Sequence, residues 1–135
     1  MTDRITRISL TEPYPTSEYA HAMVVEAGRM AMFSGVCPLD GEEQVVAPGD
    51  LDRQTDQVVA NAMTILAKAG ATPEDVVRTV VYVASAEREE VAGAWNRLLE
   101  SELGPALRSA ATLLGVTTLG YPGQMLEVEL TAALP

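Results

Sequence analysis

The sequence predicts an α+β domain in which one sheet carries two helices on the same face. Two segments, residues 51–69 and 86–103, have apolar residues at helical spacing, and strand-like runs precede and follow each of them. The predicted order is β-β-β-α-β-α-β-β, and its two strand–helix–strand halves suggest a pseudo-duplicated sheet with both helices on one side. The other face of such a sheet has to be covered, so the same pattern predicts a homo-oligomer.

Length and composition limit the alternatives. A chain of 135 residues suits one domain, residues 1–135, and its 47% hydrophobic and 21% charged residues are ordinary for a globular protein. A net charge of −10 disfavours nucleic acid and anionic membranes as partners. The single cysteine, Cys37, permits no internal disulfide and favours a reducing compartment. With no signal-peptide pattern and no apolar run of the ~18–20 residues that a membrane helix needs, we expect a cytoplasmic protein.

The N-terminal third contains short strands. Residues 4–10 alternate well enough for a strand, whereas residues 11–18 contain two prolines that prevent a regular element. Residues 19–27 and 29–33 are predicted as two strands of a hairpin that ends at Ser34.

The middle of the chain has clear helix boundaries. After a loop at residues 37–50, Asp50 is a suitable N-cap for the helix of residues 51–69, and Gly70 is a natural stop. Residues 72–75 have a capping box with proline at the first helical position, which predicts a single turn.

The second half predicts a central strand, a helix and two closing strands. Residues 76–83 are nearly apolar on both faces, as in a strand covered on both sides. The helix of residues 86–103 places Trp95 on its buried stripe, and Tyr121-Pro122-Gly123 suits a type II turn between the last two strands.

The closing segment, GPALRSAATLLGVTTLGYPGQMLEVELTAAL, contains the candidate chemistry. Its first apolar run opens with Arg108, and its second carries Glu127 and Glu129 on one face of a strand, roughly 6–7 Å apart. Either this face is exposed to solvent, or a cation and a ligand cavity lie against it. The simplest alternative is that Arg108 pairs with one of these glutamates across strands, because the sequence does not fix the strand register.

Several segments occur together in an order that is typical of one family. They are SEYAHA around Tyr19, FSGVCPLDG from Phe33, QTDQVVANAMTILAKAGATPEDVVRTVVYVA from Gln54, PALRSAATL from Pro105 and LEVEL from Leu126. Together they resemble the Rid (YjgF-type) family of reactive enamine/imine deaminases, over about residues 19–133.

The resemblance implies a chorismate-mutase-like α+β fold and a homotrimer. The sheets would line a central barrel with the helices outside and three ligand clefts between subunits. The implied activity is hydrolytic deamination of 2-imino acids or enamines to 2-keto acids and ammonia, with no metal or other cofactor.

The resemblance also implies roles for particular residues. Arg108 matches the arginine that binds the substrate carboxylate, although Leu107 is extra in this chain, and Glu127 matches the glutamate that helps to place the attacking water. A guanidinium holds a carboxylate through two parallel hydrogen bonds, and a carboxylate can orient and deprotonate water. The substrate-binding positions that the family pattern gives are Tyr19, Ser34, Gly35 and Ala110.

Three positions depart from the family pattern. Val36 stands where the family often has glutamine, Ala92 where it has an asparagine, and Ala110 where it has a cysteine. The lost amides suggest a different substrate shape or a divergent subgroup.

Other candidates have simpler explanations. The only histidine, His21, has two readings, a proton shuttle or, more simply, a packing residue. Cys37 has no histidine partner in the sequence that would activate it as a nucleophile. Trp95 fits core packing better than substrate stacking, Tyr121 fits a turn, and Glu129 fits a structural role.

Three functions therefore stay open. The first is an imine deaminase. The second is a trimer that binds small carboxylates and regulates a partner. The third is a pathway-specific catalyst for a larger enamine or cyclic imine. A ribonuclease role is the weakest because of the charge of −10.

Overall fold

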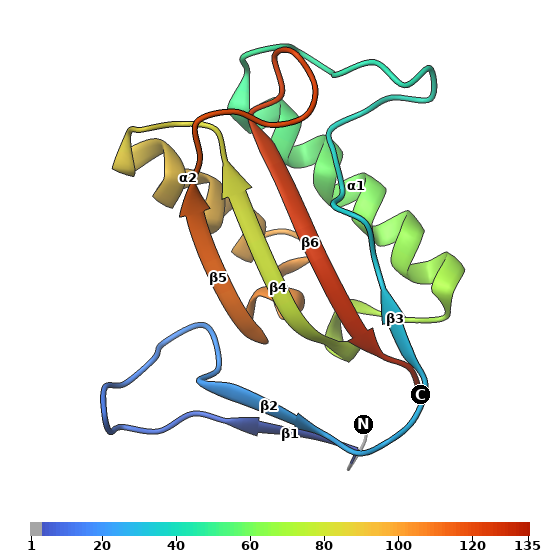
Figure 1. Ribbon diagram of the computed structural model, residues 1–135, viewed down its shortest axis with the longest axis vertical. Coiled ribbons are helices and arrows are strands. Elements are labelled where there is room, and N and C mark those ends of the chain that lie inside the picture. The colour runs from blue at the N-terminus through green and yellow to red at the C-terminus, as the bar shows by residue number, and fades with distance from the viewer. Residues whose placement is uncertain (1–3) are drawn as a thin grey trace.

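The computed structural model describes residues 4–135. Figure 1 shows the arrangement of its elements. They are β1 (Ile5–Ile8), β2 (Ala22–Val25), β3 (Met30–Met32), α1 (Leu51–Ala69), the 3₁₀ turn η1 (Pro73–Asp75), β4 (Val76–Val83), α2 (Arg88–Leu99), α3 (Gly104–Leu107), β5 (Ala110–Gly115) and β6 (Leu126–Ala133).

The main sheet has four strands in the order β3-β6-β4-β5, in which β4 and β5 are parallel and the other pairs are antiparallel. The helices α1 and α2 lie on the same face of this sheet (Figure 1). Strands β1 and β2 form a separate antiparallel pair near one end of the sheet. The predicted α+β architecture with two helices on one face is confirmed.

The helix ends follow local chemistry. At the start of α1 the Asp50 carboxylate accepts a hydrogen bond from the backbone N–H of Arg53 at 3.1 Å, and Gly70 ends the helix with a φ of +84°. The turn η1 has the capping box expected at residues 72–75. These predictions are confirmed.

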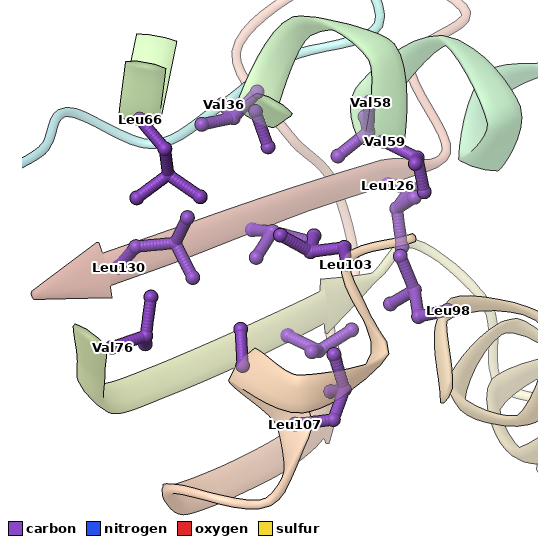
Figure 2. Packing of buried hydrophobic residues seen from close by; sticks show 14 of the residues in the cluster. Val36, Val58, Val59, Leu66, Val76, Leu98, Leu103, Leu107, Leu126 and Leu130 are labelled. Carbon is purple, nitrogen blue, oxygen red and sulfur yellow. The ribbon is translucent and has the colours of Figure 1, made fainter. Parts of the chain in front are cut away.

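The core lies between the helices and the covered face of the sheet. Alternate residues of β6, including Leu126, Val128 and Leu130, are at most 1% exposed and pack against the apolar stripes of the helices (Figure 2). Figure 2 shows Val58 and Leu66 of α1 above β6, with Leu98 of α2 at one side.

The opposite face of the sheet is open. Its residues on β4 and β6 include Tyr82, which pairs with Glu127, and Val80, which pairs with Glu129. Met32 of β3 is 78% exposed, and Leu114 of β5 is 41% exposed. As predicted, β4 is a central strand, but the chain's own helices cover only one of its two faces.

The predicted hairpin of residues 19–27 and 29–33 is wrong. Strand β2 pairs with β1, and β3 instead pairs with β6, a hundred residues away in the sequence. The chain therefore leaves one sheet and enters the other between Val25 and Met30. The chain bends at residues 27–28, where the turn was predicted, but β3 continues into the main sheet beside β6 and does not fold back on β2.

The predicted helix of residues 86–103 is too long, and Arg108 does not open a strand. Helix α2 ends at Leu99, where the Ser101 hydroxyl donates to the Leu98 carbonyl at 2.6 Å and accepts from the Leu103 N–H at 3.1 Å. These side-chain bonds replace the next helical turn. The short helix α3 follows, and Arg108 is its C-cap, two residues before β5 begins.

No helix among residues 4–135 has the length and apolar character that a membrane crossing requires.

Candidate active site

Arg108 has a fixed backbone and a free side chain. Next to it, the buried Ser109 hydroxyl donates to the Ala106 carbonyl at 2.6 Å, and the Thr79 hydroxyl of β4 donates to the same oxygen at 2.7 Å. The exposed guanidinium of Arg108 makes no hydrogen bond or ion pair with any residue of the described chain. A guanidinium whose backbone is fixed and whose charge has no internal partner suits the binding of an anion.

Tyr19 and Ala110 lie near Arg108. The N–H of Ala20 donates to the Ser109 carbonyl at 3.0 Å, which ties the Tyr19 segment to the start of β5. The Tyr19 ring meets Trp95 edge-to-face with centroids 6.4 Å apart. We call Arg108, Tyr19 and Ala110 the arginine half-site.

A cavity of about 480 Å³ adjoins the arginine half-site. Aromatic rings and one carboxylate form much of its wall; the lining residues are Tyr14, Glu18, Tyr19, Trp95, Ala111, Thr112 and Leu113. The Trp95 indole N–H donates to the Glu18 carboxylate at 2.9 Å. Trp95 is 8% exposed, so it packs in the core as expected and also borders this cavity.

Glu127 is held on the open face at the other end of the sheet. Its Oε1 accepts from Nε2 of Gln124 at 3.1 Å and lies 3.5 Å from the Cys37 thiol sulfur. Its carboxylate also lies against Gly35: a Cβ added there would be 2.6 Å from Cδ of Glu127 and would overlap Oε2. We call Glu127, Ser34 and Gly35 the glutamate half-site.

Cys37 is a proton donor in this half-site. Burial, and then the charge of Glu127 and the hydrogen bond to it, raise the pKa of the Cys37 thiol to about 11. At neutral pH it is therefore a thiol, which makes it a poor nucleophile and a suitable donor to the carboxylate.

The two half-sites are far apart in one protomer. Ala110 is in register with Arg78, and Glu127 with Tyr82, four residues farther along β4. With about 3.3 Å per residue and about 4.8 Å between strands, the backbones of Ala110 and Glu127 are roughly 16 Å apart. The predicted site residues thus fall into two groups rather than one: Arg108, Tyr19 and Ala110 in the first, and Glu127 and Gly35 in the second, with Ser34 exposed next to Gly35 in the chain.

Arg108 and Glu127 do not form the ion pair of the simplest alternative, because β4 lies between β5 and β6. Glu129 has a partner within the sheet, the Tyr82 hydroxyl at 2.8 Å. That hydrogen bond, with burial and the charge of Glu129, raises the pKa of Tyr82.

The remaining candidates lie elsewhere. Val36 is 3% exposed and exchanges backbone hydrogen bonds of 2.7 and 3.1 Å with Val128, so its side chain belongs to the core. Ala92 is exposed on α2. Nδ1 of His21 accepts from the Leu10 N–H at 3.0 Å, and its ring meets Tyr14 edge-to-face, which is a packing role.

Tyr121 begins the turn that precedes β6. Its carbonyl accepts from the N–H of Gln124 at 3.1 Å, and Gly123 has a φ of +79°, as the third position of a type II turn requires.

Sequence reasoning missed three polar residues. Gln54 and Gln124 are 0% and 4% exposed, and both hold the segment before β6. Arg7 donates to the carbonyls of Arg108 and Glu18, each at 3.0 Å. The proline-glycine turn at residues 122–123 was a signal for a fixed loop, but nothing in the sequence marked which amides hold it.

Among residues 4–135, no group of three or more His, Cys, Asp or Glu side chains is arranged to hold a metal ion.

The chain has clear relatives of known family. Residues 9–134 match the family described as "Endoribonuclease L-PSP". The RutC family protein PYRAB12510 of Pyrococcus abyssi is 35% identical over 71 residues, which are 53% of this chain and 54% of that protein. The aligned part thus spans about half the length of this curated relative.

Solved structures match over nearly the whole chain. The Rid-family protein YyfB of Yersinia pestis, whose function is unknown, is 30% identical with a TM-score of 0.84, over 97% of this chain and 99% of that one. Rv2704 of Mycobacterium tuberculosis, a member of the YjgF/YER057c/UK114 family, is 26% identical with a TM-score of 0.58, over 96% and 99%.

Proposed function

Because the chain belongs to the Rid family, we propose that it hydrolyses 2-imino acids, or the enamines that tautomerise to them, to 2-keto acids and ammonia. Arg108 binds the substrate carboxylate, and Glu127 places and deprotonates the attacking water. The observation that carries this proposal is the presence of a guanidinium without an internal partner just before β5 and of a carboxylate on β6 that is held at a single oxygen.

The reaction takes place between subunits of a homotrimer. The backbones of Ala110 and Glu127 are roughly 16 Å apart, and Arg108 lies two residues before Ala110, so we take Arg108 of one protomer and Glu127 of another to bind the same small imine. The exposed apolar side chains of the open face, such as Met32 and Leu114, support burial of this face in an assembly.

The chemistry needs few groups. The protonated imine carbon accepts the water oxygen while Glu127 takes a proton from that water, and the C=N electron pair moves to nitrogen. In the tetrahedral carbinolamine, protonated Glu127 returns its proton to the nitrogen. The C–N bond then breaks as an oxygen lone pair forms the C=O bond, ammonia leaves, and the hydroxyl proton passes to Glu127 and from there to water. Arg108 holds the carboxylate in one plane throughout.

A second candidate is a larger enamine or cyclic imine. The aromatic cavity of about 480 Å³ beside the arginine half-site favours it, because the cavity has room for an apolar substrate side chain. A panel of imines that differ only in side-chain size distinguishes the two candidates by their kcat/KM.

Nucleic acid remains the least suitable substrate. The chain carries nine basic against nineteen acidic residues, and binding of a polyphosphate backbone depends on basic side chains.

The test is an imine-hydrolysis assay. An amino-acid oxidase generates the imine in situ, and its loss is followed with and without the protein. We expect Arg108→Ala to lower kcat/KM by about 100-fold, mainly through KM, because two charge-assisted hydrogen bonds are lost. The matched control is Arg53→Ala, an exposed arginine of α1 outside both half-sites.

Two results would count against the proposal. A wild-type rate equal to that of buffer across several imines would exclude the activity, and the regulatory trimer would then be the better hypothesis. An Arg108→Ala variant as fast as the wild type would remove Arg108 from the mechanism.

A further inference from the structure

Gln124 occupies a position that fits a task at Glu127 better than a general packing role. It is 4% exposed, yet its side chain is an amide in a loop rather than an apolar group. Both ends of the amide are used. Its Oε1 accepts from the Tyr121 N–H at 3.1 Å, and its Nε2 donates to the Leu126 carbonyl at 3.0 Å and to Glu127 at 3.1 Å.

These contacts fix which way the amide points. A flipped amide would set its NH₂ group against the Tyr121 N–H and its oxygen against both the Leu126 carbonyl and the Glu127 carboxylate. All three contacts would then be repulsive. Gln124 must therefore donate to Glu127.

Cys37 reaches the same carboxylate oxygen from another segment. The thiol carries its proton at neutral pH, and its sulfur lies 3.5 Å from Oε1 of Glu127 and 3.7 Å from the Gly35 carbonyl oxygen. The carboxylate is both the nearer and the charged acceptor, so the single proton points to Oε1. Both donors thus meet Oε1, whereas Oε2 receives no hydrogen bond from the described residues 4–135 and lies over Gly35.

The loop that carries Gln124 is itself held in place. The side chain of Gln54, 0% exposed, donates to the Gly123 carbonyl at 2.8 Å and accepts from the Met125 N–H at 2.7 Å. Gln124 lies between these two residues, so its backbone has little freedom.

We propose that Gln124 and Cys37 are positioning residues: they hold Oε1 of Glu127 and leave Oε2 as the oxygen that meets the water at Gly35. This inference rests on the proposed function, in which Glu127 places the attacking water. Without the two donors the carboxylate can rotate, and its basic oxygen is no longer fixed over the cleft.

The first experiment compares Gln124→Glu with the wild type across pH. At neutral pH the new carboxylate repels Glu127, so we expect kcat to fall at least tenfold with little change in KM, because Arg108 still binds the substrate. At lower pH the new side chain takes up a proton and donates again, so the ratio of its kcat to the wild-type value rises. The matched control is Gln44→Glu, the same change at an exposed loop position.

The paired variants Cys37→Ser and Cys37→Ala test the second donor. Serine keeps a proton to donate, and alanine does not, so we expect Cys37→Ser to retain more of the wild-type kcat than Cys37→Ala. This pair also keeps the inference testable if Gln124→Glu fails to fold, which circular dichroism reports.

A measurement without turnover separates this inference from the proposed function. Cys37 is the only cysteine, so its alkylation by iodoacetamide across pH reports the thiol directly. We expect Glu127→Gln to move the alkylation profile to lower pH, because the neighbouring charge is removed.

The outcomes are distinct. An active wild type with a pH-independent, wild-type kcat in Gln124→Glu overturns the inference and leaves the proposed function standing. An unchanged alkylation profile in Glu127→Gln overturns the Cys37 contact whether or not the protein hydrolyses imines. An inactive wild type with a shifted profile removes the proposed function and with it the catalytic meaning of the contact.

Discussion

At the scale of single residues, Gly35 shows how an absent side chain shapes the site. Its backbone lies where the Glu127 carboxylate needs space, and any Cβ there would overlap that carboxylate. Gly35 thus acts through packing, since its φ is not in the left-handed region. The glycine is needed for the position of Glu127 and not for a turn.

This packing predicts the effect of Gly35→Ala. The methyl group would displace the Glu127 side chain, so we expect a loss of about 1–3 kcal/mol in stability and a larger relative loss of kcat. Thermal unfolding and the imine assay measure the two effects. Gly41→Ala is the matched control, because a Cβ at Gly41 meets no atom within 4 Å; equal losses in both variants would contradict the packing argument.

The site was only partly predictable at this scale. Glu127 and its face follow from strand alternation, and Leu126, Val128 and Leu130 are buried opposite it. The register between Arg108 and Glu127 was not predictable, because it depends on which strand lies between β5 and β6. Nor could the amide of Gln124 be found, because its partners become neighbours only after folding.

At the scale of elements, α1 does more than cover the sheet. Gln54 in its first turns reaches the loop before β6 and the loop before α1, where it donates to the Ala47 carbonyl at 3.1 Å. The apolar periodicity predicted the helix from Leu51 to Ala69 correctly, but it did not indicate that the polar residue Gln54 is fully buried. A side chain that joins two loops leaves no periodic pattern.

Replacing this residue tests the connection. Gln54→Leu keeps the volume but leaves the Gly123 carbonyl and the Met125 N–H without partners, so we expect a loss of about 2–4 kcal/mol in unfolding free energy. Gln57→Leu, one turn farther along α1, is the control and should cost much less. Chemical denaturation measures both, and similar values for the two variants would show that the loops do not depend on Gln54.

The elements that sequence patterns missed have two causes. The pairing of β3 with β6 depends on a partner far outside any local window. The end of α2 at Leu99 depends on local bonds of Ser101, but the sequence there has no glycine or proline stop signal before Gly104. Asp50, Gly70 and the capping box at Thr72 were found because they match known cap patterns. Helix ends were therefore predictable where the sequence carries such a pattern, and strand pairing was not.

At the scale of the whole molecule, the open face and the divided site support the same conclusion. One protomer presents Arg108 at one end of the sheet and Glu127 at the other. It also leaves apolar residues such as Met32 without cover. A cyclic assembly would satisfy both conditions, because each contact between neighbours would join one arginine half-site to one glutamate half-site.

Mixed assemblies test this arrangement directly. At substrate concentrations well below KM, Arg108→Ala and Glu127→Gln should each be nearly inactive alone. Co-expression should restore activity, because some clefts then take Arg108 from one variant and Glu127 from the other. In a ring of three, each mixed assembly has one cleft in three that holds both intact residues, so we expect the isolated mixed assemblies to have about a third of the wild-type activity. Two affinity tags isolate the mixed assemblies, and light scattering gives their mass. Mixed assemblies no more active than the single variants would mean that both residues act within one protomer, which the strand register of β4, β5 and β6 opposes.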